Sequence, residues 1–200
     1  MPITFNGNGT ITGVSVGGLP DGIVDTDMLA ANAVSSAKLA SGVGGKILQV
    51  KQTVVSSRVS ATLTNNTFTD ISGLSVDIQP ASTSNKILVY YHLGLCTNSG
   101  TYNVQTRIVR GSTAIGIGDQ VGSSRQRVTN QGWTISNYQS VNYDNMFLDS
   151  PNTTSSTTYK LQWTNSYDGQ TAYLNRIWQD GDSKYYPTSI SHITVMEVAA

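Results

Sequence analysis

The chain has 200 residues and a mass of 21.4 kDa, and its 12 basic and 12 acidic side chains give a formal net charge of zero. This balance argues against nucleic-acid binding, because neutralising phosphates takes a surplus of Lys and Arg. The apolar runs are far shorter than the about 20 residues that span a bilayer, and no basic and apolar segment opens the chain, so we expect neither membrane insertion nor a secretion signal. The single cysteine, Cys96, excludes an internal disulfide and a cysteine-rich metal site.

The composition changes near Gly45. Residues 1–45 hold a single aromatic residue, Phe5, whereas all the other aromatic residues lie in residues 46–200. Because a large core needs large apolar side chains, we expect one folded domain over residues 46–200. Residues 1–45 are expected to become ordered only against another chain, and the alternative is a disordered leader.

The first part of this leader, TFNGNGTITGVSVGG, contains two Asn-Gly steps followed by spaced apolar residues at Ile11, Val14 and Val16. A turn signal followed by such spacing is typical of a short strand. We therefore expect a strand that adds to the sheet of a partner chain.

A ten-residue repeat follows in the leader. Residues 24–34 align with residues 34–44, so that Leu29 matches Leu39. Each unit combines a helix-capping residue with one leucine, which is too little to form a core in one chain. We therefore expect copies of the chain to associate in a stalk; a chance match in an alanine-rich stretch is the alternative. The candidate residues for oligomerisation or attachment are Ile11, Val14, Val16, Leu29, Val34 and Leu39.

The rest of the chain consists of short alternating or β-branched and aromatic segments, separated by turn signals such as Asp168-Gly169. The strongest segment, residues 86–95, predicts a buried central strand. No window shows a helical period, so we expect an all-β fold, an antiparallel β-sandwich of jelly-roll type. The segments expected to form strands are residues 47–55, 58–64, 67–71, 74–80, 86–95, 101–110, 157–166, 171–178 and 189–198.

Candidate catalytic patterns are weak. The G-x-S-x-G pattern at residues 13–17 lies in the leader, without the α/β framework in which such a serine becomes a nucleophile. His92 and His192 are too few for a metal triad in one chain and are expected to be strand side chains with a hydrogen-bond partner, although three copies of one histidine could meet on a three-fold axis. Glu197 is the single Glu, so a carboxylate pair for sugar hydrolysis is poorly supplied. We therefore expect no enzyme, no catalytic residue, no cofactor and no metal site.

Aromatic residues are more suggestive of binding. Tyr and Trp residues crowd the second half of the body, and the segments 165–171 and 179–186 combine them with Asn, Asp, Gln and Ser. Aromatic faces stack on the apolar faces of sugars, and small polar groups provide adaptable hydrogen bonds. Most of these rings are expected in the core or in a subunit interface. The candidate glycan contacts are the loop residues Tyr167, Tyr185 and Tyr186.

These residues together resemble tail-fibre-type virion structural proteins of tailed bacteriophages, including marine ones. In the leader, the resemblance is carried by the motif V-[TS]-x-x-K-L-A-x-G-V, here residues 34–43. In the body, it is carried by residues 71–89, 108–118, 148–162 and 193–200.

The resemblance implies a homotrimer whose N-terminal segment docks on another virion protein and whose β-sandwich faces the host surface. Two repeats make the leader too short for a long fibre, since 45 extended residues reach about 150 Å at most. The expected protein is a non-enzymatic short tail fibre or appendage that attaches to a host-surface glycan, placed in the virion after assembly in the host bacterial cytoplasm. Open alternatives are a head fibre or capsid decoration, an adaptor without receptor binding, and a polysaccharide depolymerase.

Overall fold

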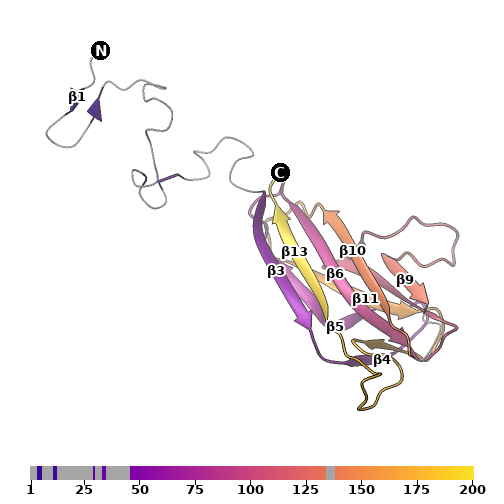
Figure 1. Ribbon diagram of the computed structural model, residues 1–200. Helices are drawn as coiled ribbons and strands as arrows, with labels where there is room; N and C mark the ends of the chain where they lie inside the picture. Colours follow the sequence, from indigo (N-terminus) through magenta and orange to yellow (C-terminus); the bar gives the residue numbers. More distant parts are fainter. Residues whose placement is uncertain (1–3, 6–10, 13–28, 30–32, 35–45, 134–137) are drawn as a thin grey trace. The chain divides into compact units, whose positions relative to one another are not determined.

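The computed structural model describes residues 4–5, 11–12, 29, 33–34, 46–133 and 138–200 (Figure 1). The chain divides into two compact units, residues 1–45 and 46–200, at the position where the composition changes. In the first unit, β1 (Thr4–Phe5) pairs antiparallel with β2 (Ile11–Thr12), which contains the candidate residue Ile11.

The other candidate residues of the leader are only partly covered by the structure. Leu29 and Val34 are exposed. Val14, Val16 and Leu39 lie outside the described residues, as do the G-x-S-x-G pattern and most of the ten-residue repeat. The predicted stalk therefore stays a prediction.

The described part of the body contains strands and no α-helix. Nine segments were predicted as strands, and each contributes to an observed one. The strands are β3 (Ile47–Val55), β4 (Val59–Leu63), β5 (Thr69–Ile78), β6 (Lys86–Thr97), β7 (Asn103–Arg110), β8 (Thr113–Ile115), β9 (Asn130–Trp133), β10 (Val141–Asp149), β11 (Thr157–Asn165), β12 (Gln170–Leu174) and β13 (Ser191–Val198).

Two antiparallel sheets pack face to face (Figure 1). The first sheet has the order β3-β13-β6-β10, and β12 and β4 extend it beside the end of β6. The second has the order β5-β11-β7, with β8 and β9 on the free edge of β7. When β4, β8 and β12 are left out, eight strands of the body remain. If these are numbered 1 to 8 along the chain, the strand order is 1-8-3-6 in the first sheet and 2-7-4-5 in the second. This is the jelly-roll arrangement, and the predicted fold class is confirmed.

The core lies between the two sheets. In β6, Ile87, Val89, Tyr91 and Leu93 point inward and are fully buried, because successive side chains of a strand face opposite sides of its sheet. Trp163 of β11 and several other large side chains of the second sheet pack against them. The predicted central position of residues 86–95 is confirmed. The sequence also predicted that this strand is buried. This is wrong for every second residue from Lys86 to His92, because these side chains face outward and are only half-buried.

Two other local predictions are wrong. Two strands were expected over residues 67–71 and 74–80, with a break at Ser72-Gly73. Instead one continuous strand, β5, runs through these residues, and in it Gly73 has a φ of 80° and the register with β11 shifts. A Cβ at Gly73 would lie 2.9 Å from Val55 Cγ2, so glycine accommodates a β-bulge here. The strand expected over residues 171–178 ends at Leu174, because Asn175 turns the chain with a φ of 62°.

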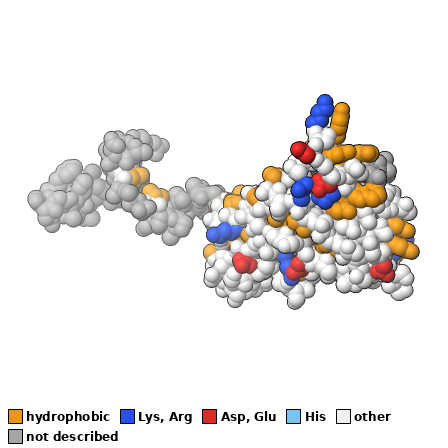
Figure 2. All heavy atoms as spheres, turned by 90° about the horizontal axis from the view of Figure 1, so that it is seen from below, with side chains coloured by type: hydrophobic (Ala, Val, Ile, Leu, Met, Phe, Trp, Pro, Cys, Tyr) orange, Lys and Arg blue, Asp and Glu red, His pale blue; other side chains and the backbone are white. Residues whose placement is uncertain are grey.

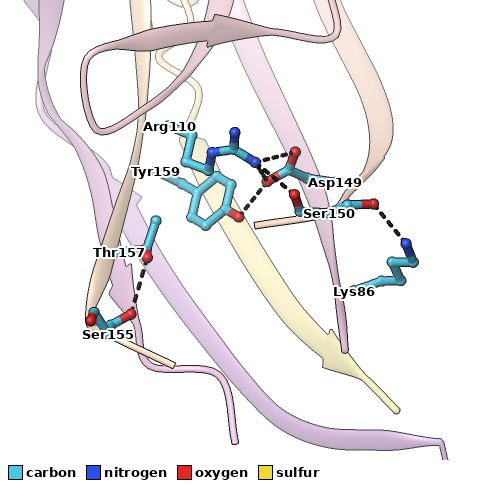
Figure 3. A network of polar contacts seen from close by, with 7 residues as sticks. All are labelled: Lys86, Arg110, Asp149, Ser150, Ser155, Thr157 and Tyr159. Atoms are coloured by element: carbon cyan, nitrogen blue, oxygen red, sulfur yellow. Dashed lines mark hydrogen bonds and ion pairs between the residues drawn. The ribbon is translucent and has the colours of Figure 1, made fainter. Parts of the chain in front are cut away.

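We call the end of the sandwich where β3 begins the base, and the end where β3 and β6 finish the loop end. At the base, Asp149 of the first sheet accepts hydrogen bonds from Arg110 (2.9 Å to each oxygen) and from the Tyr159 hydroxyl (2.6 Å) of the second sheet (Figure 3). Arg110 also donates to the Ser150 carbonyl, and Lys86 donates to the Ser150 hydroxyl. Asp149 is buried, so this cluster joins the two sheets through a charged pair in the interior.

A second buried carboxylate, Glu197, holds the end of β13 at the base. It accepts hydrogen bonds of 2.6 Å from the Gln49 side chain, the Asn85 side chain and the Ala81 backbone N–H. Burial alone would raise the pKa of Glu197, but these donors favour the charged form and hold the pKa below its ordinary value. These three short hydrogen bonds tie Glu197 of β13 to β3 and to the connection that precedes β6, and they stabilise its charged form.

Candidate functional site

The connections at the loop end carry all three candidate glycan contacts. β3 and β6 both run from the base and finish at this end (Figure 1). Tyr167 lies in the connection from β11 to β12, and Tyr185 and Tyr186 lie in the long connection from β12 to β13. The antiparallel topology therefore brings residues about 20 positions apart to the same end of the body.

Tyr167 sits on a turn that is fixed by several backbone contacts. Its N–H donates to the Asn165 side chain at 3.2 Å, and the next residue, Asp168, accepts a 2.6 Å hydrogen bond from the Asn65 N–H. The Tyr167 ring stacks on Tyr102, with ring centroids 4.5 Å apart and an interplanar angle of 12°. Tyr167 is nevertheless 53% exposed, so this pair forms an aromatic platform with an accessible side.

A polar hollow begins at the residue next to Tyr167. Buried Gln105 Oε1 accepts no hydrogen bond from any residue that the structure describes. The lining of the hollow offers amide, hydroxyl and guanidinium groups, which can exchange hydrogen bonds with the hydroxyl groups of a ligand. The hollow is lined by Asn65, Asn66, Gln105, Asp119, Val121, Ser124, Arg125, Gln126, Val128, Gln131 and Ser166.

The connection that carries Tyr185 and Tyr186 is anchored where it leaves the sheet. The Asn175 side chain donates to the carbonyls of Val55 (2.8 Å) and Ser57 (3.0 Å) and accepts a hydrogen bond from the Ser191 hydroxyl (2.6 Å). These contacts hold together the two points at which the connection leaves and rejoins the first sheet. The residues between them project beyond the sheet as a defined loop.

Within this connection, tyrosines alternate with charged groups. The Tyr186 ring stacks on Tyr138 with centroids 6.2 Å apart, and Tyr185 is 71% exposed with the Lys184 ammonium 5.3 Å from its ring. Asp180 accepts hydrogen bonds from Arg58 at 2.7 and 2.9 Å. Figure 2, which views the body from the loop end, shows hydrophobic side chains gathered beside basic and acidic ones. The structure thus gives Tyr186 a stacked ring partner and leaves Tyr185 as a protruding ring beside an ammonium group.

The partner rings Tyr102 and Tyr138 could not be assigned from the sequence. Tyr102 follows a Ser-Gly-Thr turn and Tyr138 lies in a separate connection, so nothing in their spacing links them to Tyr167 or Tyr186. The pairs meet because the sandwich closes connections that are far apart in the chain. Each predicted contact therefore has a stacking partner or a charged neighbour.

The two histidines are brought together by the first sheet. His92 of β6 pairs in register with His192 of β13, and their ring centroids are 6.0 Å apart. His92 Nδ1 lies 2.7 Å from an Asp144 carboxylate oxygen, so the predicted strand position with a hydrogen-bond partner is confirmed for His92. Burial lowers the pKa of His192, and the neighbouring His92 adds to this, while Asp144 opposes it.

In the described part of the chain, no three His, Cys, Asp or Glu side chains converge as metal ligands would. The same residues form no long apolar helix that could cross a membrane.

Comparison with known proteins yields only a weak structural likeness. No protein-family model and no curated protein match the chain. The crystal structure of the infectious bursal disease virus VP2 subviral particle overlaps 76% of this chain and 42% of that chain, with 10% identity and a TM-score of 0.40. The structure of the infectious bursal disease virus Gx strain overlaps 77% of this chain and 38% of that chain, with 12% identity and a TM-score of 0.35. This chain spans less than half the length of either, and its function has to be inferred from its own residues.

Proposed function

We propose that this chain is a non-enzymatic structural protein of a virion, a short homotrimeric tail fibre or appendage. Residues 1–45 anchor it to another virion protein, and the jelly-roll body attaches to a glycan on the host surface. The proposal combines the resemblance of the sequence to phage tail-fibre proteins with the arrangement of the body.

The observation that carries the proposal is the opposite placement of attachment point and aromatic loops. The leader joins the body at Lys46, next to the start of β3 at the base, and the exposed Tyr167 and Tyr185 lie at the loop end. An appendage needs this polarity, because the surface that contacts the host has to face away from the surface that holds the virion.

The chemistry of the loop end supports a carbohydrate ligand. The Tyr102–Tyr167 platform offers an aromatic face, and the hollow that starts at Ser166 offers amide and hydroxyl groups. Sugars present apolar faces and hydroxyl groups in the same molecule. Single contacts of this kind are weak, and display of three copies raises the avidity through effective concentration.

The test is binding of the purified full-length protein to an array of bacterial surface glycans, together with its mass in solution. We expect binding to at least one glycan, and the substitution Tyr167→Ala should weaken it by about tenfold per site, the equivalent of one aromatic contact. Thr154→Ala, an exposed substitution in the connection from β10 to β11 at the base, is the matched control and should leave binding unchanged.

Absence of any binding by a multimeric protein would refute host attachment through glycans and favour a head decoration or an adaptor. Release of reducing ends from host capsule would refute the non-enzymatic role and favour a depolymerase.

A further inference from the structure

Part of the outer face of the first sheet is apolar, although it points away from the core. Across the sheet, Val50 of β3, Met196 of β13, Leu88 of β6 and Leu148 of β10 lie side by side in register. Val50 and Leu148 are 53% and 52% exposed, and the next row adds Met146 at 65%. Val54, 50% exposed, lies one row further on, in register with His192, His92 and Asp144. We call this surface, with residues Val50, Val54, Leu88, Met146, Leu148 and Met196, the apolar face.

The second sheet provides an internal comparison, since its outer face is polar. There Asp70 of β5 pairs with Lys160 of β11 at 2.8 Å and accepts a hydrogen bond from Gln162, which in turn accepts one from Arg107 of β7. An outward-facing sheet surface in a sandwich is ordinarily polar in this way. The apolar face therefore has the composition of a buried surface, and exposed apolar patches of this kind mark interaction sites.

The apolar face has the size of the centre of a protein interface. Four strands spaced about 4.8 Å apart, with the five residues from Val50 to Val54 at about 3.3 Å each, make a surface of roughly 300 Å². A stable protein interface buries about 800 Å² per partner. The face would thus supply the apolar centre of one standard interface, and the half-buried Tyr90 next to Met146 belongs to it.

The properties of the chain favour a second copy as the occupant. The leader holds one aromatic residue in 45, so it lacks the large side chains needed to cover four strands. The chain has no net charge, so two copies do not repel each other. The charged groups at the margins of the face are already engaged, Asp144 with His92 and Lys86 with Ser150. The leader joins the body at Lys46, beside the β3 end of this surface.

We propose that the apolar face is a self-association surface, on which copies of this chain pack their first sheets against one another. The contact is made by the bodies and does not depend on the proposed role in host attachment. Failure of glycan binding would leave it intact. A monomer would refute both this surface and the homotrimer of the proposed function, whereas a multimer in which this face is open to solvent would refute the surface alone.

The test uses the full-length protein with two readouts, mass by light scattering and the rate of methionine oxidation by dilute peroxide. In the wild type we expect a mass of at least two chains of 21.4 kDa each. We also expect slow oxidation of Met146 and Met196, because oxidants reach them only when the face is free. The double substitution Met146→Lys and Leu148→Lys should raise the dissociation constant by at least about a hundredfold, because two ammonium groups would lose water in the contact. Met196 should then be oxidised rapidly.

Ile190→Lys is the matched control, since Ile190 is 52% exposed but lies in the connection from β12 to β13, outside the apolar face. It should keep the mass and the protection of both methionines. Three outcomes would overturn the proposal: a monomeric wild type, a multimer in which Met196 is oxidised as fast as in the double variant, and protection that persists in a monomer. The second outcome would assign the association to another surface, and the third would assign the covering to the leader.

Discussion

The base and the loop end of the sandwich use their polar and aromatic side chains in opposite ways. At the base, Asp149 and Glu197 are buried, and each is held by several donors from neighbouring strands. At the loop end, the stacked Tyr167 and the protruding Tyr185 stay largely open to solvent. One end of a single small fold can therefore hold its two sheets together through buried charges, while the loops at the other end leave aromatic side chains open to solvent.

The largest effect should come from removing the buried carboxylate that joins the sheets. We expect Asp149→Ala to lower the free energy of unfolding by about 3–5 kcal/mol, because Arg110 then remains as a mostly buried charge without its partner. Asp182→Ala, an exposed substitution in the connection from β12 to β13, should change it by less than about 0.5 kcal/mol. Urea unfolding monitored by tryptophan fluorescence measures both.

Similar losses in the two variants would contradict the comparison between the ends. Tyr159→Phe separates the contribution of this hydrogen bond from that of the ion pair, since it removes the hydroxyl that donates to Asp149 and leaves Arg110 in place. A loss of about 1–2 kcal/mol is expected for one hydrogen bond to a charged acceptor.

A smaller loss is expected at the second carboxylate of the base. Glu197→Gln places an amide against the donors of Gln49 and Asn85, and should lower the free energy of unfolding by about 2 kcal/mol at neutral pH. Because the pKa of Glu197 is lowered in the fold, its contribution is complete above the ordinary value of 4.5 and is lost as the pH falls below it. The difference between wild type and variant should therefore shrink in acid. A difference that is constant down to about pH 3 would show that Glu197 does not titrate in this way.

Much of the fold could be predicted from the sequence because most strands alternate cleanly. β10 was missed, since its polar Asn145 and Asp149 share the inward side with Tyr143 and Phe147, while Met146 and Leu148 point outward. This pattern breaks the period of two. Its inward acid is explained by Arg110 and Tyr159 of the other sheet, and its outward apolar residues belong to the surface for which self-association is proposed.

The candidate site was predictable at the level of single residues and not at the level of pairs. Tyr167, Tyr185 and Tyr186 are recognisable because tyrosines within polar loops have no place in the core. Their partners Tyr102 and Tyr138 come from other connections and meet them through the closure of the sandwich. A local pattern contains no information on such long-range pairings.

The smallest change in the free energy of unfolding should come from the protonation of His192. The pKa of His192, at the start of β13 near the loop end, is lowered by burial and by the neighbouring His92, against the opposing influence of Asp144. The unfolded chain then binds a proton more readily than the fold, so stability should fall as the pH drops below the ordinary value of 6.5.

Unfolding of the wild type and of His192→Gln between about pH 7.5 and 5 measures this effect, because only His92 and His192 are histidines in the chain. The wild type should lose more stability than the variant over this interval, well above the interval in which Glu197 titrates. Parallel curves would assign the loss to His92 or to other groups. Two separate intervals, one removed by each substitution, would show that His192 and Glu197 make their contributions to the free energy of unfolding over different ranges of pH.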